Sequence, residues 1–480
     1  MRTEFTLMAF TAMGILTLHL AGAASAEERH QMKDANGTVV TCPAPKGAAL
    51  SDQYTVKVNG KPVDVYLAPV WAPGYVKSFG GPYSFAYFDC SGSVTVEIGS
   101  RKSLQRVRIL PESRGIRPDV KGDTLTFVLK SPCQLSIEPA AKEGPLLLFA
   151  NPMEIDPPKE GDPGVIYFGP GMHKPGEIKV GDNQTLYIAG GAVVKGGIHA
   201  QGANIRIRGR GIVDGLDWER FKGPTGNLIC LTKCTNASVE GVILKDSWSW
   251  TFPMWDCRGV HIDNVKICSA RCENNDGIGT CNSQDVEIEN CFIRTDDDSI
   301  TAKGMGENLG PPPYPPVENL TVERCVLWAD RANVFRLGCE CRAQVMRRLV
   351  FRDIDVLHYT DPTCPVIILQ PAEGMLMEEV QFENIRINGE GQRKFIEISP
   401  SPTQWAKQQT PGMVRKVLFK DMVLDGVSGD NLGLIEVAGF DAGHIVEGVT
   451  FENMVRFGRR VTQDSPSVRI GENTKDIVFK

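Results

Sequence analysis

The stretch that decides the fold runs from Asn274-Asn275-Asp276-Gly277-Ile278 to Asp296-Asp297-Asp298-Ser299-Ile300-Thr301-Ala302-Lys303-Gly304. Between these ends, residues 286–293 read Val-Glu-Ile-Glu-Asn-Cys-Phe-Ile and alternate apolar and polar residues like a half-buried strand. Asp276 is followed 21 positions later by Asp297. If one structural coil takes about that many residues, the two side chains lie at matching points of neighbouring coils, because stacked strands are about 4.8 Å apart. The stretch therefore predicts stacked coils with a cluster of carboxylates on one surface.

From about Val165 onward the same kind of unit recurs: alternating apolar residues, then Asn, Asp, Gly or Arg, then apolar residues again. The units are Ile205–Gly209, Val239–Gly241, Val260–Asn264, Val286–Asn290, Leu320–Arg324, Val350–Asp353, Val380–Asn384, Val417–Asp421 and Val449–Asn453. Their steps of 21 to 37 residues indicate a solenoid, and no amphipathic helix pattern interrupts them. Each coil must bury its apolar face on its neighbours, and we expect the Asn and Asp side chains at the turns to hydrogen-bond along the stack.

The N-terminal part has a different pattern. Short alternating strands between Tyr54 and Ile137, with Asn59-Gly60 as a hairpin turn, predict a β-sandwich. The proline-rich stretch 145–158 is typical of an exit strand and a linker. We therefore predict an all-β protein with a signal peptide at 1–26, an N-terminal β-sandwich domain and linker at 27–158, and a solenoid domain at 159–480, which the family resemblance given below makes a β-helix catalytic domain.

Composition narrows the class of protein. The chain has 480 residues, a net charge of −6 and a pI of about 5.8, which disfavours nucleic acid or an anionic membrane as partner. The N-terminus has Arg2, an apolar core at Phe5–Leu20 and Ala24-Ser25-Ala26 as a cleavage site after Ala26. We expect a secreted or periplasmic protein, with no membrane span and monomeric.

The fourteen cysteines allow two interpretations. In an exported chain they are candidates for disulfides, and the close pairs are Cys230/Cys234, Cys268/Cys272 and Cys339/Cys341. Alternatively, Cys268, Cys291 and Cys325 are small buried residues stacked between coils. We expect a mixture. A zinc site is disfavoured because the seven histidines are scattered.

Carboxylates forced together have their pKa values pushed apart, so that one stays protonated near neutral pH. An acid and a base in one place can hydrolyse a glycosidic bond, and an inverting pair is separated by about 6.5 to 9.5 Å to admit water. The alternatives are an aspartate ladder that caps turns, or a calcium site. We expect catalysis without a cofactor or metal. Alternation should turn Asp296 away from Asp297, into a structural role.

The stretch resembles glycoside hydrolase family 28, whose pattern is Asn-Thr-Asp followed by Asp-Asp-x-Ile/Val-Ala-Ile-Lys-Ser-Gly. Asn274-Asn275-Asp276 matches the first part with Asn for Thr, and Asp297–Gly304 matches the second with one residue fewer before the Gly. Gly209–Gly215 is similar to the family's Gly-x-Gly-x-Ile-Asp-Gly turn. The resemblance implies a right-handed, single-stranded parallel β-helix of the pectin-lyase-like kind and inverting hydrolysis. It makes Asp297 the general acid, while Asp276 and Asp298 activate water. A sandwich before the helix resembles family 49, the dextranases and isopullulanases.

Two departures from the family pattern bear on the substrate. The family's Gly-His-Gly reads Ala332-Asn333-Val334 here, and its Arg-Ile-Lys has no match near Val366–Gln370. Both a uronate glycan and a neutral, dextran-like glucan are therefore open. Arg331 and Arg336 are candidates to bind a charged sugar, because Arg suits bidentate carboxylate binding. The alternative for Arg336 is a surface ion pair with Glu340.

The remaining candidates for substrate binding are Lys303, Asn333, Arg336, Asn274, Trp250 and Gln370. Lys303 matches the family's Lys after the aspartate pair and could lower a carboxylate pKa or bind a hydroxyl. Trp248, Trp250 and Trp255 lie in the preceding loop, and we expect at least two of them to pack inside it.

Two rival functions remain. A polysaccharide lyase would use aspartates to bind calcium and an Arg or Lys to remove a proton, and the Asn-x-Asp plus Asp-Asp arrangement argues against it. A non-catalytic carbohydrate-binding β-helix would keep the acidic cluster as structure only. In each case the partner is a polysaccharide or oligosaccharide. The insert at 305–316 could block one end of a cleft, as an exo-acting enzyme requires.

Overall fold

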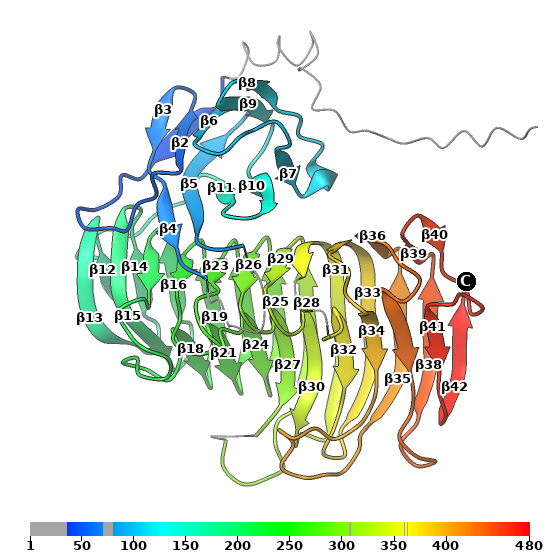
Figure 1. Ribbon diagram of the computed structural model, residues 1–480. Helices are drawn as coiled ribbons and strands as arrows, with labels where there is room; N and C mark the ends of the chain where they lie inside the picture. Colours follow the sequence, from blue (N-terminus) through cyan, green and yellow to red (C-terminus); the bar gives the residue numbers. More distant parts are fainter. Residues whose placement is uncertain (1–35, 71–79, 307–308, 360, 362) are drawn as a thin grey trace, which may run out of the picture.

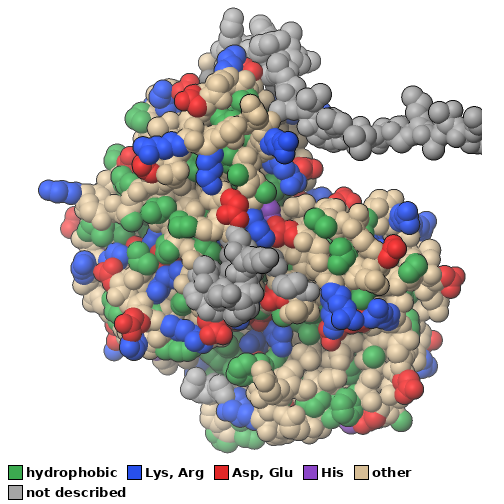
Figure 2. Space-filling view, viewed as in Figure 1, with side chains coloured by type: hydrophobic (Ala, Val, Ile, Leu, Met, Phe, Trp, Pro, Cys, Tyr) green, Lys and Arg blue, Asp and Glu red, His purple; other side chains and the backbone are tan. Residues whose placement is uncertain are grey.

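The computed structural model describes residues 36–70, 80–306, 309–359, 361 and 363–480 (Figure 1). The predicted signal peptide, residues 1–26, lies outside the described residues. Among the described residues no helix has the length and apolar character needed to cross a membrane. Basic and acidic side chains are interspersed over the visible surface (Figure 2).

The N-terminal part is a β-sandwich of two sheets, as predicted. One sheet has the order β1-β5-β11-β10-β7 with β4 on β5, and comprises β1 (Thr38–Thr41), β4 (Tyr66–Ala68), β5 (Tyr83–Ser91), β7 (Arg108–Leu110), β10 (Cys133–Lys142) and β11 (Leu146–Asn151). The other has the order β3-β2-β6-β9-β8, and comprises β2 (Tyr54–Val58), β3 (Lys61–Val63), β6 (Val94–Ser100), β8 (Asp119–Lys121) and β9 (Thr124–Leu129). A short 3-10 helix spans Glu112–Arg114. Asn59 and Gly60 both have positive φ and join β2 to β3 in a two-residue hairpin.

From β12 onward the chain forms a right-handed parallel β-helix with three faces. The first face comprises β12 (Val165–Phe168), β14 (Thr185–Ile188), β16 (Arg206–Gly209), β19 (Thr235–Glu240), β22 (Arg258–Asp263), β25 (Gln284–Glu289), β28 (Val317–Glu323), β31 (Val345–Tyr359), β33 (Leu376–Gly389), β35 (Met413–Lys420), β38 (Val446–Glu452) and β42 (Thr474–Phe479). The second comprises β13 (Gly171–Val180), β15 (Ala192–Ala200), β17 (Ile212–Asp214), β20 (Ile243–Lys245), β23 (Lys266–Ser269), β26 (Phe292–Thr295), β29 (Val326–Ala329), the later parts of β31 and β33, β36 (Val423–Gly426) and β39 (Val455–Arg456), with β40 (Arg459–Arg460) paired to β39. The third comprises the later parts of β13 and β15, β18 (Ile229–Thr232), β21 (Phe252–Trp255), β24 (Ile278–Cys281), β27 (Ile300–Gly304), β30 (Phe335–Cys341), β32 (Ile367–Gln370), β34 (Lys394–Ile398), β37 (Leu434–Val437) and β41 (Val468–Ile470).

The repeat unit encodes the corner between the first and second faces. The last residue of most units, for example Asn290, Arg324 or Asn384, has a φ between 51° and 56°, a left-handed conformation that Asn and Asp adopt more readily than other non-glycine residues. The predicted hydrogen bonding along the stack is confirmed: Asn384 Nδ2 donates to Asp353 Oδ1 at 2.6 Å. Asn453 Nδ2 makes the same bond to Asp421 at 2.6 Å.

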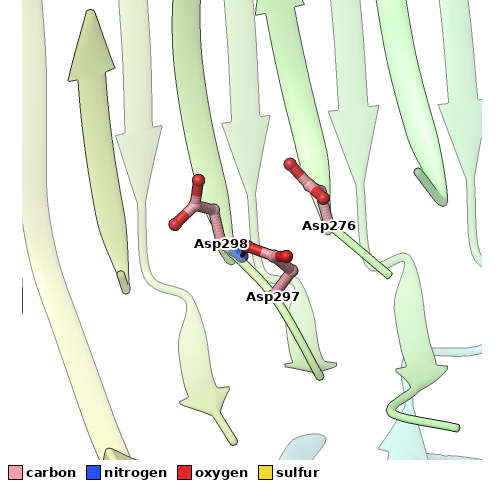
Figure 3. A group of neighbouring side chains, drawn as sticks. All are labelled: Asp276, Asp297 and Asp298. Carbon is pink, nitrogen blue, oxygen red and sulfur yellow. Dashed lines mark hydrogen bonds between the residues drawn. The ribbon is translucent and has the colours of Figure 1, made fainter. Parts of the chain in front are cut away.

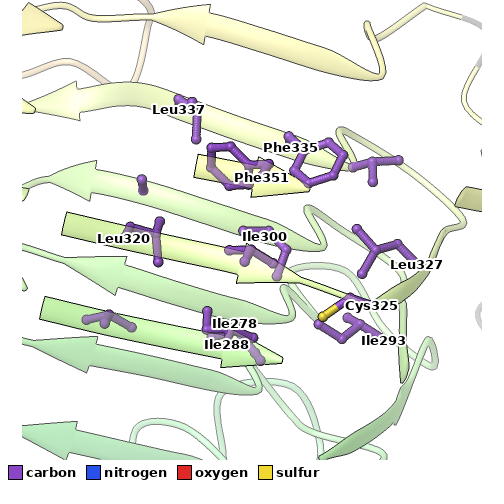
Figure 4. Packing of buried hydrophobic residues seen from close by; sticks show 14 of the residues in the cluster. Ile278, Ile288, Ile293, Ile300, Leu320, Cys325, Leu327, Phe335, Leu337 and Phe351 are labelled. Carbon is purple, nitrogen blue, oxygen red and sulfur yellow. The ribbon is translucent and has the colours of Figure 1, made fainter. Parts of the chain in front are cut away.

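Apolar side chains fill the interior of the helix in rows, one residue per coil. Ile278 and Ile300 are fully buried, and Phe335 follows Ile300 in register on the next coil (Figure 4). A second row stacks aromatic rings, with Phe382 and Phe419 5.2 Å apart and nearly parallel. Because the coils present the same residue class at the same register, the core runs through the whole stack.

The cysteines are all free thiols, and all fourteen lie in described residues. The expectation of disulfides is therefore not met. All three of Cys268, Cys291 and Cys325 are almost completely buried, but the predicted stacking between coils holds only for Cys291 and Cys325, because Cys268 packs between the second face and the sandwich. Cys291 and Cys325 occupy successive coils inside the helix core, where a thiol packs as a small apolar group.

The sandwich packs on the second face of the β-helix (Figure 1). Phe149 of β11 contacts Phe292 of β26, with ring centroids 5.2 Å apart, and the Arg294 guanidinium lies 4.3 Å from the centre of the Tyr83 ring. The strands β23, β26 and β29 are thus covered by the N-terminal domain. The chain leaves these strands directly into the turns that carry the aspartates.

Candidate active site

The aspartates lie at the corner between the second and third faces (Figure 3). Asp276 precedes β24, and Asp297 and Asp298 precede β27 on the next coil. Ile278 pairs with Ile300, so Asp276 and Asp298, each two residues earlier, are the equivalent positions. Gly277 N donates to Asp298 O at 2.8 Å, which continues the strand register into the turn. The predicted equivalence of Asp276 with Asp297 is therefore wrong by one residue, because this coil takes 22 residues (300 − 278) and not 21.

Close approach of the two coils at this corner requires a glycine. A Cβ atom on Gly277 would lie 2.2 Å from Ser299 O, a distance that no side chain tolerates. The glycine of the Asn-x-Asp-Gly motif thus permits the aspartate-bearing turns to pack against each other. We call Asp276, Asp297 and Asp298 the acidic corner.

The acidic corner is compact and mostly buried. One carboxylate oxygen from each residue lies within 4.8 Å of those of the other two. Asp276 and Asp298 are 5% and 4% exposed, whereas the Asp297 side chain is 14% exposed and faces outward most. The oxygens are closer than the span of about 6.5 to 9.5 Å expected of an inverting pair. Oxygens this close could also hold a divalent cation, in competition with Lys303 and Arg336 beside them.

Burial sets the electrostatics of the acidic corner. Burial, and then the negative charge of Asp297, raise the pKa of Asp276 well above its usual range, against the opposing effect of Lys303. The same two causes raise the pKa of Asp298 to about 6, although Arg336 and Lys303 oppose them. The corner therefore offers two carboxyls with raised pKa values, Asp276 and Asp298, and the pKa of Asp298 is about 6.

Asp297 is held by an arginine that it shares with Asp296. Arg331 Nη2 lies 3.0 Å from Asp297 Oδ2 and 2.9 Å from Asp296 Oδ2. Asp297 Oδ1 also accepts a hydrogen bond from Asp298 N at 2.9 Å. Asp296 is fully buried, and burial raises its pKa to about 8 although Arg331 lowers it. Its carboxylate contacts the same Arg331 nitrogen as that of Asp297, so the expectation that Asp296 turns away from Asp297 is not met. Arg331, a candidate sugar ligand in the sequence, is thus engaged with protein carboxylates.

Asn333, Arg336 and Gln370 form one hydrogen-bonded unit beside Asp298. Arg336 Nη1 donates to Asn333 Oδ1 at 2.8 Å, and its Nη2 donates to Gln370 Oε1 at 3.2 Å. Asn333 N donates to Asp298 Oδ1 at 2.8 Å. The alternative of an ion pair between Arg336 and Glu340 is not what the structure shows, because Glu340 lies 3.1 Å from Lys303 Nζ.

Lys303 lies on the outer side of β27, close to the acidic corner. Burial alone would lower its pKa, but Glu340, Asp276 and Asp298 raise it above its usual range, so the ammonium is charged. Its Nζ also lies 4.6 Å from the centre of the Trp250 ring. Trp250 in turn stacks on Trp255 at 6.0 Å, so this ring is engaged by protein groups.

The other predicted residues have packing roles. Trp248 is fully buried and donates from Nε1 to Thr225 O. Trp255 is 8% exposed and lies on β21, so its packing is that of a strand residue and not of a loop residue as expected. Asn274 accepts a hydrogen bond from Arg220 Nη2 and is thereby tied to the loop before β18.

Sequence reasoning missed the partner of Lys303 and the outer charge network. Glu340 lies in β30 after Gly338 and Cys339, which have φ values of 106° and 80°, where the register with β27 shifts. Because of this irregularity, the inward and outward alternation of side chains along the strand is interrupted, so the sequence pattern does not indicate which way the Glu340 side chain points. Glu273 pairs with Arg220 at 2.8 Å and lies 3.8 Å from Arg331, and only its place next to Asn274 could have pointed to it.

The part of the chain that carries the acidic corner is similar in sequence to known proteins. Residues 183–310 match the sequence model of "Glycosyl hydrolases family 28". This segment contains the whole acidic corner and Lys303, whereas Asn333 and Arg336 lie beyond it. The chain is 24% identical to probable polygalacturonase At1g80170 of Arabidopsis thaliana over 271 residues, which are 48% of this chain and 58% of that protein. The chain thus spans less than two thirds of the length of this relative.

Solved structures match the fold over a larger share of the chain. Dex49A from Penicillium minioluteum superposes with a TM-score of 0.68 at 14% identity and covers 92% of this chain and 96% of its own. The family 28 exopolygalacturonase of Yersinia enterocolitica gives a TM-score of 0.52 at 14% identity, covering 93% and 96%. In its β-helix the chain is therefore similar over residues 183–310 to glycosyl hydrolases family 28, and its fold as a whole is similar to that of Dex49A.

Proposed function

We propose that the protein is a glycoside hydrolase that cleaves a polysaccharide at the acidic corner. The observation that carries this proposal is the meeting of three carboxylates within 4.8 Å at one corner of the segment that matches family 28. Burial and mutual repulsion give these carboxyls different proton affinities, which is what acid and base roles at one pH require.

In this proposal Asp297 protonates the glycosidic oxygen, because it is the member of the corner most open to a bound sugar. One oxygen of Asp276 lies within 4.8 Å of one oxygen of Asp297, and burial raises the pKa of Asp276 well above its usual range, so Asp276 is a proton donor close to the acid. Asp298, which ionises near pH 6, accepts the proton of the attacking water.

The short separation is compatible with a water held between Asp276 and Asp298. O–H···O hydrogen bonds are about 2.7 to 2.8 Å long, so one water can bridge two oxygens up to about 5.5 Å apart. The oxygens here lie within 4.8 Å. A water in this position would attack directly, and the product would have inverted anomeric configuration.

The substrate class follows from two considerations. The matching plant relative is named a polygalacturonase, which favours an acidic, uronate-containing glycan. A neighbour that covers 92% of this chain with a TM-score of 0.68 is named Dex49A, and Arg331 and Lys303 are already paired with protein carboxylates, which favours a neutral glycan as the second candidate. We also propose that the protein is exported, on the strength of its N-terminal sequence pattern, which N-terminal sequencing of the mature protein would test. Light scattering would test the expectation of a monomer.

The test is a reducing-end assay on pectic, dextran-like and other plant or algal polysaccharides, with wild type beside Asp297→Asn. Asp285→Asn is the matched control, because Asp285 is a half-exposed aspartate on the first face whose φ of 55° suits Asn equally well. We expect release of reducing ends by wild type and by the control, and loss in Asp297→Asn. A product absorbing in the ultraviolet without water uptake would instead identify a lyase. Glycan binding without turnover by wild type would identify a binding protein.

A further inference from the structure

Arg336 lies on the outer side of β30, in register with Thr301 on β27. Its guanidinium donates from Nη1 to Asn333 Oδ1 and from Nη2 to Gln370 Oε1, and its Nε lies 3.8 Å from Asp298 Oδ2. The Cys339 side chain on the same strand also interacts with it. Two of these partners are neutral amide oxygens, so the nearest anion to Arg336 in this group is the Asp298 carboxylate. The side chain is 17% exposed and desolvated enough for that charge to act strongly.

The amide of Asn333 has a fixed orientation. Its Nδ2 donates to Pro365 O, which leaves Oδ1 to face Arg336. Its backbone N donates to Asp298 Oδ1, so Asn333 hydrogen-bonds both to the Asp298 carboxylate and to the Arg336 guanidinium beside it. Asn333 is the position that follows Asp298 in register on the next coil, because Ile300 pairs with Phe335. The parallel stack thus places the supporting residue directly above the carboxylate that it supports.

We propose that Asn333, Arg336 and Gln370 are a positioning unit for Asp298, in which Arg336 keeps this carboxylate ionised and aimed at the attacking water. The proposal rests on the proposed hydrolytic function. It assigns to these three residues a role different from the substrate binding expected from the sequence.

Several charged and titratable groups act on Asp298 besides Arg336. They are Asp276 on the preceding coil, Asp297 in the same turn, Lys303 on β27, and Tyr359 and Cys364 two coils further on. Cys339 and Glu340 of β30 act on Arg336 itself. Burial and Asp297 raise the pKa of Asp298, and Arg336 is the first of the groups that lower it. Removal of the guanidinium should therefore make Asp298 harder to ionise.

The experiment compares wild type with Arg336→Gln and Arg336→Lys on whichever glycan the wild type cleaves. Arg347→Gln is the control, because Arg347 pairs with Glu318 on the first face, away from the acidic corner. We expect Arg336→Gln to lower kcat by about tenfold or more with little change in KM, since small misplacements of a reacting group are costly. The acidic limb of the kcat/KM profile should move to higher pH. Arg336→Lys should restore part of the rate, and added guanidinium chloride should rescue Arg336→Gln.

A raised KM with an unshifted acidic limb would overturn the proposal, because it would show that Arg336 binds the substrate. An unchanged profile would overturn it as well. A measurement that does not depend on turnover distinguishes failure of the positioning proposal from failure of the proposed hydrolytic function. In protein labelled with ¹³C-aspartate, the carboxyl resonance that disappears in Asp298→Asn should titrate at higher pH in Arg336→Gln. If that shift is found and no glycan is cleaved, the positioning role of these residues is supported and the proposed hydrolytic function is contradicted. If wild type cleaves glycan and the Asp298 resonance titrates at the same pH in Arg336→Gln, the positioning role is contradicted while the hydrolytic function is supported.

Discussion

Asp276 and Asp298 are equivalent residues of successive coils, each two positions before a strand of the third face, and the strands begin with the paired residues Ile278 and Ile300. The register therefore places one carboxylate directly above the other. Asp297, which matches no aspartate on the preceding coil, is the outlier of the three and the one tied to Arg331. The three aspartates are thus two stacked residues and one that projects beside them.

The stacked pair predicts the effect of removing Asp298. We expect Asp298→Asn to lower kcat by about 10²-fold or more, because the carboxylate that accepts the water proton is lost while the shape is kept. Reducing-end release on the active glycan measures this. Full activity of Asp298→Asn would contradict its role as base, and Asp285→Asn should keep wild-type activity.

The pH profile should have an acidic limb near pH 6. Burial and Asp297 raise the pKa of Asp298 to about 6, and Asp298 must be ionised to accept a proton, so activity should rise as pH rises through about 6. Measurement of kcat/KM between pH 4 and about 9 tests this assignment. A limb near pH 4, the ordinary range of a carboxyl, would show that another group controls the rate.

The stereochemistry of the product tests the arrangement of water. Inversion is expected if the water is held between Asp276 and Asp298 and attacks in one step. Proton NMR of the first product anomer, recorded before mutarotation, reads this out. Retention would mean that one of these carboxylates attacks the sugar itself, which the separation of less than 4.8 Å would then explain.

His358 should make the domain interface sensitive to alkaline pH. Its Nε2 lies 2.8 Å from Glu138 of the sandwich, and its Nδ1 contacts Glu390 of the β-helix, so both nitrogens face carboxylates and the ring is an imidazolium. Burial would lower its pKa, but Glu138 and Glu390 raise it to about 9. A folded-state pKa above the unfolded value of about 6.5 means that this stabilisation is complete below about pH 6.5.

The stabilisation should then be lost as pH rises through about 9, with a magnitude on the order of 3 kcal/mol. Thermal unfolding of wild type and His358→Gln at pH 6 and about pH 10 checks this, and the two proteins should converge at the higher pH. The control is His261→Gln, because the His261 side chain is half-exposed on the first face. This substitution should leave the pH dependence of thermal unfolding as it is in wild type. An equal difference at both pH values would contradict the ionic role of His358.

The corner conformation predicts the stability of a repeat-unit variant. Asn384 has a φ of 51° and donates to Asp353 on the preceding coil. Asn384→Val should lower the free energy of unfolding by about 1 to 3 kcal/mol, because a β-branched residue is strained in the left-handed region. Asn384→Gly should cost less, although it also loses the hydrogen bond. Equal destabilisation by the two substitutions, measured in urea, would show that the hydrogen bond and not the backbone conformation matters.

The sequence by itself determined the solenoid and the identity of the acidic residues. The alternation at Val286–Ile288 and the Asn290 that ends the unit are local, and so they specify a strand and a left-handed corner wherever they occur. The Asn59-Gly60 hairpin is equally local. Asp276, Asp297 and Asp298 could be identified because motif spacing and coil length are both set along the chain.

Only the tertiary structure determined which side chains of the acidic corner lie next to each other and which are paired with other protein groups. One extra residue in the coil moved the stacking partner of Asp276 from Asp297 to Asp298, since register depends on strand pairing between coils. Asn333 and Arg336 lie on one coil and Gln370 lies on the next, and hydrogen bonds from Arg336 join all three. The burial that raises the pKa of Asp276 comes from neighbouring coils, and no stretch of sequence carries the distances on which desolvation and charge interaction depend.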